Sequence, residues 1–381
     1  MYTLQSVIKK IKKINPLIRT YLVCLLLSCE RKNCAAMARS TGIKAKPLYV
    51  FLSKSKEMIE EIQEELFKLA KKTRIKGKKR GLVIDPTHIV KAYARHIEKL
   101  GYDRAGCSKR VEKCISPIYA GLSDDNMFLP ISLNFWTQEK ITGKKRYKSK
   151  YKLAQELVLF LINKGVEFDY VVLDGAFAVQ EMLDFFHTHN IKFIMRIAKS
   201  RCITVKGKRA QLKHHSSLTL FRNSRESIVA GELLDRSYFF TAQKRKDKNK
   251  DWEVVFLISN MDMSAKEQIK IYDTRYAIEF MIRTTKQKLG AGQCQVLSTS
   301  KQQAHIMAGF LAYAIINSEN NDKQKLSVDE IINFIRESHF DSFFDTIQDK
   351  SHQNNDPVES ALSKHFQNFS QYYDQASYYA R

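Results

Sequence analysis

Four polar side chains recur at helical spacing in the segment YDTRYAIEFMIRTTK, residues 272–286. They are Tyr272, Arg275, Glu279 and Lys286. At about 100° per residue, all four project within a sector of roughly 60°. A solvated helix with ordinary i, i+4 ion pairs would also carry such a stripe. A carboxylate that lies among cations and a phenol could instead hold a metal ion beside a bound phosphate, so the rest of the sequence must decide.

Two aspartates follow short, strongly apolar segments that we expect to be buried strands. Asp85 ends the segment GLVID, and Asp174 ends the segment YVVLD. An aspartate at a strand end is often only a cap or turn residue. In open α/β sheets, however, ligands bind at the carboxyl ends of the strands, so the two aspartates share one rim if their strands are neighbours. Glu279 could supply a third carboxylate.

Three converging carboxylates repel one another and have raised pKa values unless a cation lies between them. Mg²⁺ prefers oxygen ligands and binds through a few carboxylates while it keeps positions for water and phosphate. Two ions about 3.5–4 Å apart suit phosphodiester cleavage, because one activates the attacking oxygen and the other stabilises the leaving oxygen. The sequence has no ligand-spaced His/Cys set and no GxxxxGK loop, so redox, zinc and nucleotide chemistry have less support.

The overall charge of the chain predicts a polyanionic partner. Of 381 residues, 64 are Lys or Arg and 40 are Asp or Glu, which gives a formal net charge of +24. Nucleic acid fits this charge, although an anionic membrane surface would also accept it. No apolar run approaches the roughly 20 residues that cross a bilayer, and we expect no membrane. The seven cysteines form no tight pairs, which suits the cytoplasm, with association to the nucleoid.

The elements that must position these residues alternate between helix and strand periodicity. The segment NCAAMARSTGIKAKPLYVFL resembles a DNA-binding helix-turn-helix, although a plain helical hairpin fits equally well. Later strands and helices alternate, which predicts a mixed sheet with helices packed on it. We expect a helical domain, a catalytic core in two parts, a β-rich insertion between these parts, and a helical or polar tail. The helical domain is expected over 1–75 and the two parts of the core over 76–200 and 263–320. The insertion is expected over 201–262 and the tail over 321–381.

Three motifs together resemble a known family. IDPTHIVK surrounds Asp85, LDGAFAVQEML surrounds Asp174, and two, three and six residues separate the four polar side chains of the 272–286 segment. These motifs resemble the DDE transposases of the insertion-sequence-four-like group, over about residues 20 to 320. The resemblance implies an RNase H-like mixed sheet flanked by helices. Ala176 is a departure, because the family usually has glycine at this position.

The resemblance also implies a reaction and a set of roles. The acids that match Asp85, Asp174 and Glu279 hold two Mg²⁺ or Mn²⁺ ions, and the residues that match Tyr272, Arg275 and Lys286 contact DNA phosphates near the cleavage point. Activated water would cut double-stranded DNA at the terminal inverted repeats, and the freed 3′ hydroxyl would attack the other strand and later the target DNA. A homodimer in the DNA complex is expected, although the region after residue 320 is short for a dimerisation segment.

Further residues have a functional and a structural interpretation. Some related enzymes stack a flipped base on an aromatic residue of the insertion, and Trp252 is the only tryptophan there, although a core role is the alternative. Arg196 ends IKFIMR and could reach the same rim or be solvated. Thr87 could contact Asp85 or DNA, or only form a turn. The basic segment 144–152, KKRYKSKYK, could lie on phosphates or be a solvated loop.

Two other function classes compete with an active transposase. One is a catalytically inactive DNA-binding regulator derived from a transposase, which the presence of all three acids argues against. The other is a basic protein of the membrane surface, which has little support because only the N-terminal helix resembles an amphipathic anchor.

Overall fold

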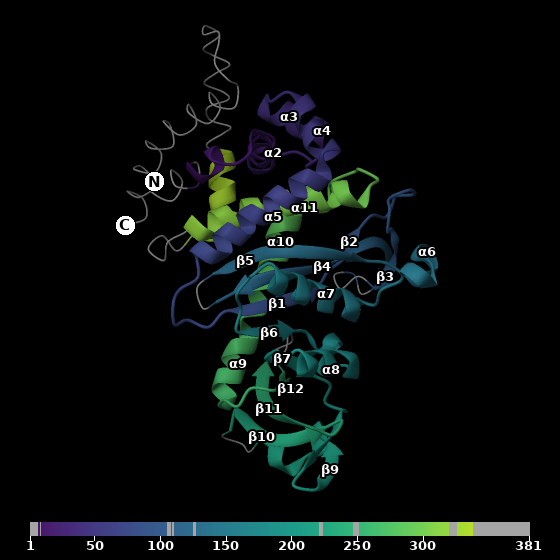
Figure 1. Ribbon diagram of the computed structural model, residues 1–381, viewed down its shortest axis with the longest axis vertical. Helices are drawn as coiled ribbons and strands as arrows, with labels where there is room; N and C mark the ends of the chain where they lie inside the picture. The colour runs from purple at the N-terminus through teal and green to yellow at the C-terminus, as the bar shows by residue number, and fades with distance from the viewer. Residues whose placement is uncertain are drawn as a thin grey trace.

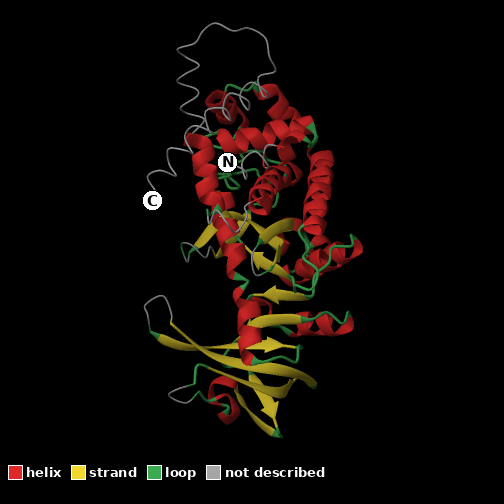
Figure 2. Ribbon diagram, turned by 90° about the vertical axis from the view of Figure 1, so that its left-hand side faces the viewer, coloured by secondary structure: helices red, strands yellow, loops and turns green. Residues whose placement is uncertain are grey.

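The computed structural model describes residues 7, 9–104, 108, 110–124, 127–220, 224–246, 251–319 and 326–337. Figure 1 shows three parts along the long axis: helices at one end, a mixed sheet in the middle and further strands at the other end. Figure 2 shows the same succession from the side. Among the described residues, no helix has the length and apolar character that are required to span a lipid bilayer.

Several helices precede the sheet. They are α2 (Pro16–Leu27), α3 (Cys34–Thr41), α4 (Ala45–Ser53) and α5 (Ser55–Lys72). Between α3 and α4, Gly42 has a φ of 70°, a left-handed conformation that glycine adopts at little cost and that ends α3. A helix, a tight turn and a second helix therefore lie within the segment that resembles a helix-turn-helix.

The central sheet is mixed, as predicted. Its strands lie in the order β5 (Phe128–Trp136), β4 (Val111–Ser123), β1 (Gly81–Pro86), β6 (Tyr170–Leu173) and β7 (Phe193–Ile197). β1, β6 and β7 are mutually parallel, whereas β4 is antiparallel to both β1 and β5. The short strands β2 (Ile89–Val90) and β3 (Gly101–Arg104) pair with the first half of β4. Together with the flanking helices, this sheet confirms the predicted α/β, RNase H-like fold class.

Helices cover this sheet and join its strands. α7 (Lys150–Asn163) packs on β4 and β5, and α8 (Gln180–Thr188) connects β6 to β7. α10 (Tyr276–Gln287) contacts β1 and β5, and α11 (Thr299–Glu319) contacts β5. The shorter helices are α6 (Glu139–Thr142), α9 (Ala265–Asp273), η1 (Lys144–Arg146), η2 (Gly175–Phe177), η3 (Leu212–His214) and η4 (Ser216–Leu218).

The strands after residue 201 continue the same sheet. They are β8 (Cys202–Val205), β9 (Lys208–Gln211), β10 (Glu226–Leu233), β11 (Arg236–Lys246) and β12 (Trp252–Ser259). β12 pairs antiparallel with β7, and the order continues through β11, β10, β8 and β9. The predicted β-rich segment is thus an extension of the core sheet. Of the predicted tail, the structure describes a helical segment at 328–337, and the range 338–381 lies outside the described residues.

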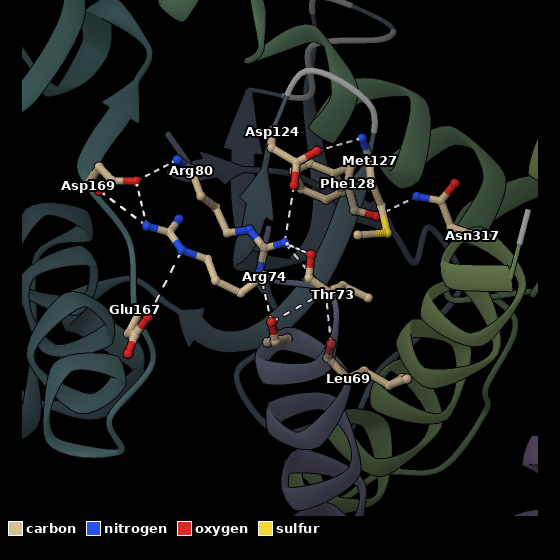
Figure 3. A network of polar contacts seen from close by, with 11 residues as sticks. Leu69, Thr73, Arg74, Arg80, Asp124, Met127, Phe128, Glu167, Asp169 and Asn317 are labelled. Atoms are coloured by element: carbon tan, nitrogen blue, oxygen red, sulfur yellow. Dashed lines mark hydrogen bonds and ion pairs between the residues drawn. The ribbon is translucent and has the colours of Figure 1, made fainter. Parts of the chain in front are cut away.

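Buried polar contacts join α5 to the amino ends of the strands (Figure 3). Arg80 lies directly before β1, and its Nη2 atom is 3.1 Å from Asp124 Oδ2, with the two side chains only 3% and 6% exposed. The same guanidinium donates to the carbonyls of Ala70 and Thr73 at the end of α5. The helical part and the sheet are therefore held together by a buried cation that bonds to both.

A second acid completes this network. Asp169, directly before β6, accepts hydrogen bonds from the backbone N–H of Arg80 at 2.6 Å and from Arg74 Nη2 at 3.0 Å. Arg74, Arg80, Asp124 and Asp169 are called the arginine network below. Arg74 also lies 4.0 Å from the exposed carboxylate of Glu167, so each cation of the network has a carboxylate partner at the amino ends of β1 and β6.

Candidate active site

The first two predicted acids lie at the same end of two adjacent strands. In the parallel register of β1 and β6, Ile84 is opposite Leu173. Asp85 directly follows Ile84, and Asp174 directly follows Leu173. Neighbouring strands are about 4.8 Å apart. The segments before them are completely buried, because the sheet and its helices cover both faces. Burial of the two strands therefore places both aspartates at one rim, as the sequence predicts.

Asp174 begins a tight turn. Its carbonyl accepts a hydrogen bond from the Phe177 N–H at 3.0 Å, which closes η2. A Cβ atom on Gly175 would lie 3.4 Å from Arg196 Cβ, so the turn passes close to the end of β7. Ala176 is exposed in this turn. The family's usual glycine is therefore replaced at a position where a methyl group points to free space.

The helix that carries Glu279 is not continuous with the helix that carries Tyr272, contrary to the prediction of one helix over 272–286. α9 ends at Asp273 and α10 begins at Tyr276. Across the junction, the N–H of Thr274 and the N–H of Arg275 bond to carbonyls three residues earlier, the pattern of a 3₁₀ turn. The tighter turn changes the rotation of the two helices, so the four side chains do not form one straight stripe.

Arg275 lies between two of the three acids. Its Nη1 atom is 3.5 Å from Asp85 Oδ1, and its Nη2 atom is 2.6 Å from Glu279 Oε1. Asp85 is 15% exposed and Glu279 is 49% exposed, so the first acid lies inside the rim and the second at its opening. The i, i+4 ion pair of the structural interpretation is thus present, but its arginine also reaches the acid of β1.

The pKa of Asp85 reflects both its burial and its charged neighbours. Burial raises this pKa from 3.8 to about 7. The cations Arg275 and Lys286 act against the rise, whereas the negative charges of Asp174 and Glu279 add to it. All three carboxylates therefore interact electrostatically at this end of the sheet. Asp85, Asp174 and Glu279 are called the acidic rim below.

Tyr272 and Arg196 border the acidic rim. Burial raises the pKa of Tyr272 to about 12, and the neighbouring charges of Arg275 and Arg196 act to lower it. The guanidinium of Arg275 lies 5.9 Å from the centre of the Tyr272 ring. Arg196 also faces Glu253 at 3.6 Å. The structure therefore brings Arg196 to this end of the sheet, beside the turn that follows Asp174.

Lys286 is held by the segment that follows Asp85. Its Nζ atom donates to Thr87 Oγ1 at 2.7 Å and to the His88 carbonyl at 2.8 Å. Thr87 is buried, and its N–H donates to the Pro117 carbonyl. The hydroxyl of Thr87 thus accepts a hydrogen bond from Lys286, a contact that was not among the roles suggested by the sequence.

A polar cluster next to the rim was missed in the sequence. His88 Nε2 is 2.9 Å from Asp103 Oδ2, and Lys150 Nζ is 2.7 Å from the same oxygen. Burial acts to raise the pKa of Asp103, but the hydrogen bonds and charges of Lys150 and His88 outweigh burial and lower it. Lys150 also lies 4.4 Å from the centre of the Trp136 ring. These residues are far apart in the chain, so no local pattern indicates them.

Trp252 is exposed and the alternative that it is a core residue is wrong. Its side chain is 59% exposed at the start of β12, and Lys246 Nζ lies 5.4 Å from the ring centre. A groove of about 730 Å³ includes both Trp252 and Arg196 in its walls. Lys199 and Lys213 also line this groove, so it offers cations and an aromatic face next to the acidic rim.

The acidic rim has the donor chemistry of a site for hard cations. It offers only carboxylate oxygens, which Mg²⁺ and Mn²⁺ prefer. Burial raises the pKa of Asp85, and the nearby cations Arg275 and Lys286 only partly oppose that rise. Within the described ranges, no three His, Cys, Asp or Glu side chains are close enough to hold a metal ion as they stand.

The basic segment 144–152 divides between two roles. Lys148 pairs with Glu156 at 2.8 Å, and Lys150 belongs to the cluster with Asp103. Lys144 and Lys145 lie in the exposed turn η1. The segment is therefore partly structural, and only its first residues are a solvated loop.

Comparisons with protein families identify the same part of the chain. Residues 11–217 match a family described as DDE superfamily endonuclease, and residues 123–315 match a family described as transposase DDE domain. Each match covers more than half of the 381 residues, and together they include the whole acidic rim. A comparison with curated proteins found no match.

Proposed function

We propose a transposition reaction for this chain, which belongs to the DDE superfamily of endonucleases and transposases. As a member it is a transposase-type nuclease, and DNA is its partner. Beyond this, we propose that it cuts double-stranded DNA at the terminal inverted repeats of a mobile element and transfers the freed 3′ ends into target DNA. The net charge of +24 supports a polyanionic substrate.

The observation that carries this proposal is the acidic rim itself. Asp85 and Asp174 end adjacent parallel strands, and Asp85 has a pKa of about 7 because it is buried near other carboxylates. A strongly perturbed pKa at such a position is typical of a functional site. We propose that Asp85, Asp174 and Glu279 hold two Mg²⁺ or Mn²⁺ ions. When bound, such ions activate the attacking water and stabilise the leaving oxygen.

The cations around the rim are proposed to hold the scissile phosphate. Arg275 now pairs with Asp85 and Glu279, and it becomes available to phosphate oxygens once these acids bind metal. Lys286 is fixed by Thr87 and so points a constant positive charge toward the rim. Donors that are already in place when charge develops on the phosphorus lower the barrier, because they need no reorganisation.

The groove next to the rim is proposed to guide the DNA strand. Arg196 begins the groove near Asp174, and Trp252 offers an exposed ring farther along β12. This arrangement supports the proposal that Trp252 stacks on a base that leaves the duplex. We also propose that two copies act together on two ends, as the inverted repeats of such elements require.

The test is cleavage of a duplex that carries the inverted repeats flanking the coding sequence. In Mg²⁺, the wild-type protein should nick this duplex at the repeat ends. Asp85→Asn, Asp174→Asn and Glu279→Gln should each reduce the rate by about 10³-fold or more, because each removes several kcal/mol of transition-state stabilisation. DNA binding should persist in all three variants. Cleavage by all three at the wild-type rate would rule the proposal out.

A further inference from the structure

A hollow beside the acidic rim has no role in the function proposed so far. It has a volume of about 600 Å³ and lies between the loop 91–97 and the loop 292–297. Val90, Ile97 and Leu297 give it apolar walls, and Tyr93 and Arg95 stand at its side. Arg31, from the segment between α2 and α3, also lines it. This space is called the Tyr93 hollow below.

The walls of the hollow are tied together by the protein. Lys91 Nζ donates to the carbonyls of Gly292 and Cys294, at 2.7 Å and 2.6 Å. The N–H of Glu98 donates to the Leu297 carbonyl at 2.9 Å. Hydrogen bonds at both ends of the loop therefore hold the two walls at a fixed separation, so the hollow is a built feature of the fold.

Tyr93 presents its ring to solvent. Its side chain is 99% exposed, and Leu297 across the hollow is also exposed. Neighbouring exposed apolar groups often mark a binding surface. An exposed tyrosine ring at the mouth of a hollow suits a flat ligand, because a nucleic acid base stacks on an aromatic face whatever its sequence.

The charge of the hollow selects an anionic ligand. Among the described residues that line it, none is acidic, and three are cations, Arg31, Lys91 and Arg95. The nearest acid of the loop, Glu98, accepts a hydrogen bond from the Thr299 N–H at 2.7 Å. A ligand with flat rings and negative charge therefore matches the Tyr93 hollow best.

The hollow lies along the path from the rim. Val90 belongs to β2, which begins four residues after Asp85, and Lys286 contacts His88 just before it. A Cβ atom on Gly292 would lie 3.2 Å from Ile89, so the second wall directly adjoins β2. A DNA strand that passes Lys286 and continues along β2 would thus reach Tyr93.

We propose that the Tyr93 hollow binds an unpaired nucleotide of the DNA strand that continues beyond the acidic rim, with its base stacked on Tyr93 and its phosphate beside Arg95. Bases within a duplex stack on one another, so their faces cannot stack on the Tyr93 ring. The hollow therefore selects a strand that is already separated. The inference rests on the proposed function, which brings DNA to the rim. It adds a second contact for the strand. In the strand order of the sheet, β2 beside the hollow and β12 with Trp252 lie on opposite sides of β1 and β6.

The test compares two oligonucleotides that differ only in their bases. One is a fluorescein-labelled 12-residue oligothymidine, and the other is an abasic chain of the same length. Fluorescence anisotropy in the absence of divalent metal measures the affinity of full-length protein for both. The wild type should prefer oligothymidine. Tyr93→Ala should weaken oligothymidine binding by about 5-fold or more and leave the abasic chain unaffected, because only base stacking is lost.

Matched variants make the result specific. Tyr93→Phe should retain the preference, and Tyr102→Ala, which removes another exposed tyrosine on β3, should not change it. Thermal unfolding of Tyr93→Ala should match the wild type, because the side chain buries almost nothing. An unchanged preference in Tyr93→Ala would overturn the inference, as would an equal loss for both oligonucleotides. Cleavage by the rim variants is measured separately, so either proposal can fail alone.

Discussion

The two ends of β1 and β6 carry opposite charge arrangements. At the amino ends, Arg80 and Asp169 belong to the arginine network, in which two cations meet two carboxylates and the central ion pair is almost fully buried. At the carboxyl ends, Asp85 and Asp174 belong to the acidic rim, where the pKa of Asp85 is raised to about 7. The same two strands thus have one end with an almost fully buried ion pair and one end with a buried acid whose pKa is raised.

The difference separates residues that stabilise the fold from residues that serve the reaction. A buried cation that is hydrogen-bonded to a carboxylate holds elements in place, and the loss of one partner is costly. Acids with strongly perturbed pKa values in an open position are typical of functional sites. Acidic and basic residues are present at both ends, so charge content alone does not distinguish the ends. Their partners do.

The largest change in the free energy of unfolding is expected for a substitution in the arginine network. Arg80→Ala should lower the free energy of unfolding by about 3–5 kcal/mol, because it leaves Asp124 buried without its cation and frees two carbonyls of α5. Urea unfolding measures this change. Arg196→Ala is the matched control, since its pair with Glu253 is about half exposed and should contribute less than 1 kcal/mol. Equal losses in both variants would contradict the comparison.

Asp85→Asn should change the free energy of unfolding by an intermediate amount and with the opposite sign, so that the variant is the more stable protein at high pH. The folded pKa of about 7 exceeds the usual 3.8, so the native state keeps a proton that the unfolded chain has lost between these pH values. The stability that this proton confers is complete below about pH 4 and is lost as the pH rises through 7. The upper limit of the loss over the whole range is roughly 4 kcal/mol. We expect about 2 kcal/mol of it between pH 5 and pH 8, because part of the loss occurs below pH 5.

Unfolding in a chelating buffer measures this difference between pH 5 and pH 8. The wild type should become less stable over that range, and Asp85→Asn should stay nearly constant and be the more stable protein at pH 8. Parallel pH profiles for the two proteins would show that Asp85 is compensated in the native state, as the acids of the arginine network are.

The smallest effect is expected for Lys286→Gln, which keeps a hydrogen-bond donor and removes the charge. DNA affinity should fall by about 5-fold, and the slope of log K against log salt should decrease by about 1, because one phosphate contact is lost. Lys68→Gln is the control near the amino ends of the strands, where this exposed lysine pairs with Glu65. Fluorescence anisotropy with a random duplex at several salt concentrations measures the slope for each variant. Equal slopes for Lys286→Gln and Lys68→Gln would show that the two ends of β1 and β6 do not differ in DNA binding.

Much of the fold could be predicted because its cause is local. The apolar segments before Asp85 and Asp174 can only be buried strands, and parallel strands bring their carboxyl ends together. The break between α9 and α10 was not predictable, since it depends on hydrogen bonds three residues apart rather than on residue type. The pairing of β12 with β7 is equally invisible, because strand periodicity does not say which strand is its neighbour.

The site, like the fold, could be predicted only as far as local sequence patterns determine it. Spacing indicates which acids and cations belong together, but the bridging position of Arg275 follows from the packing of α10 on β1. Trp252 could project to either face of its strand. It is exposed at the start of β12, before the residues that pair with β7. His88, Asp103 and Lys150 come from three separate elements, so their contact requires the folded sheet.

The central claim is that Asp85, Asp174 and Glu279 form one cation site, and calorimetric titration of the DNA-free protein with Mn²⁺ tests it most directly. The wild type should bind the ion with measurable heat. Asp85→Asn, Asp174→Asn and Glu279→Gln should each weaken binding by about tenfold or more, whereas Glu253→Gln, which removes an exposed acid outside the rim, should not. Wild-type Mn²⁺ binding in all three rim variants would contradict the account.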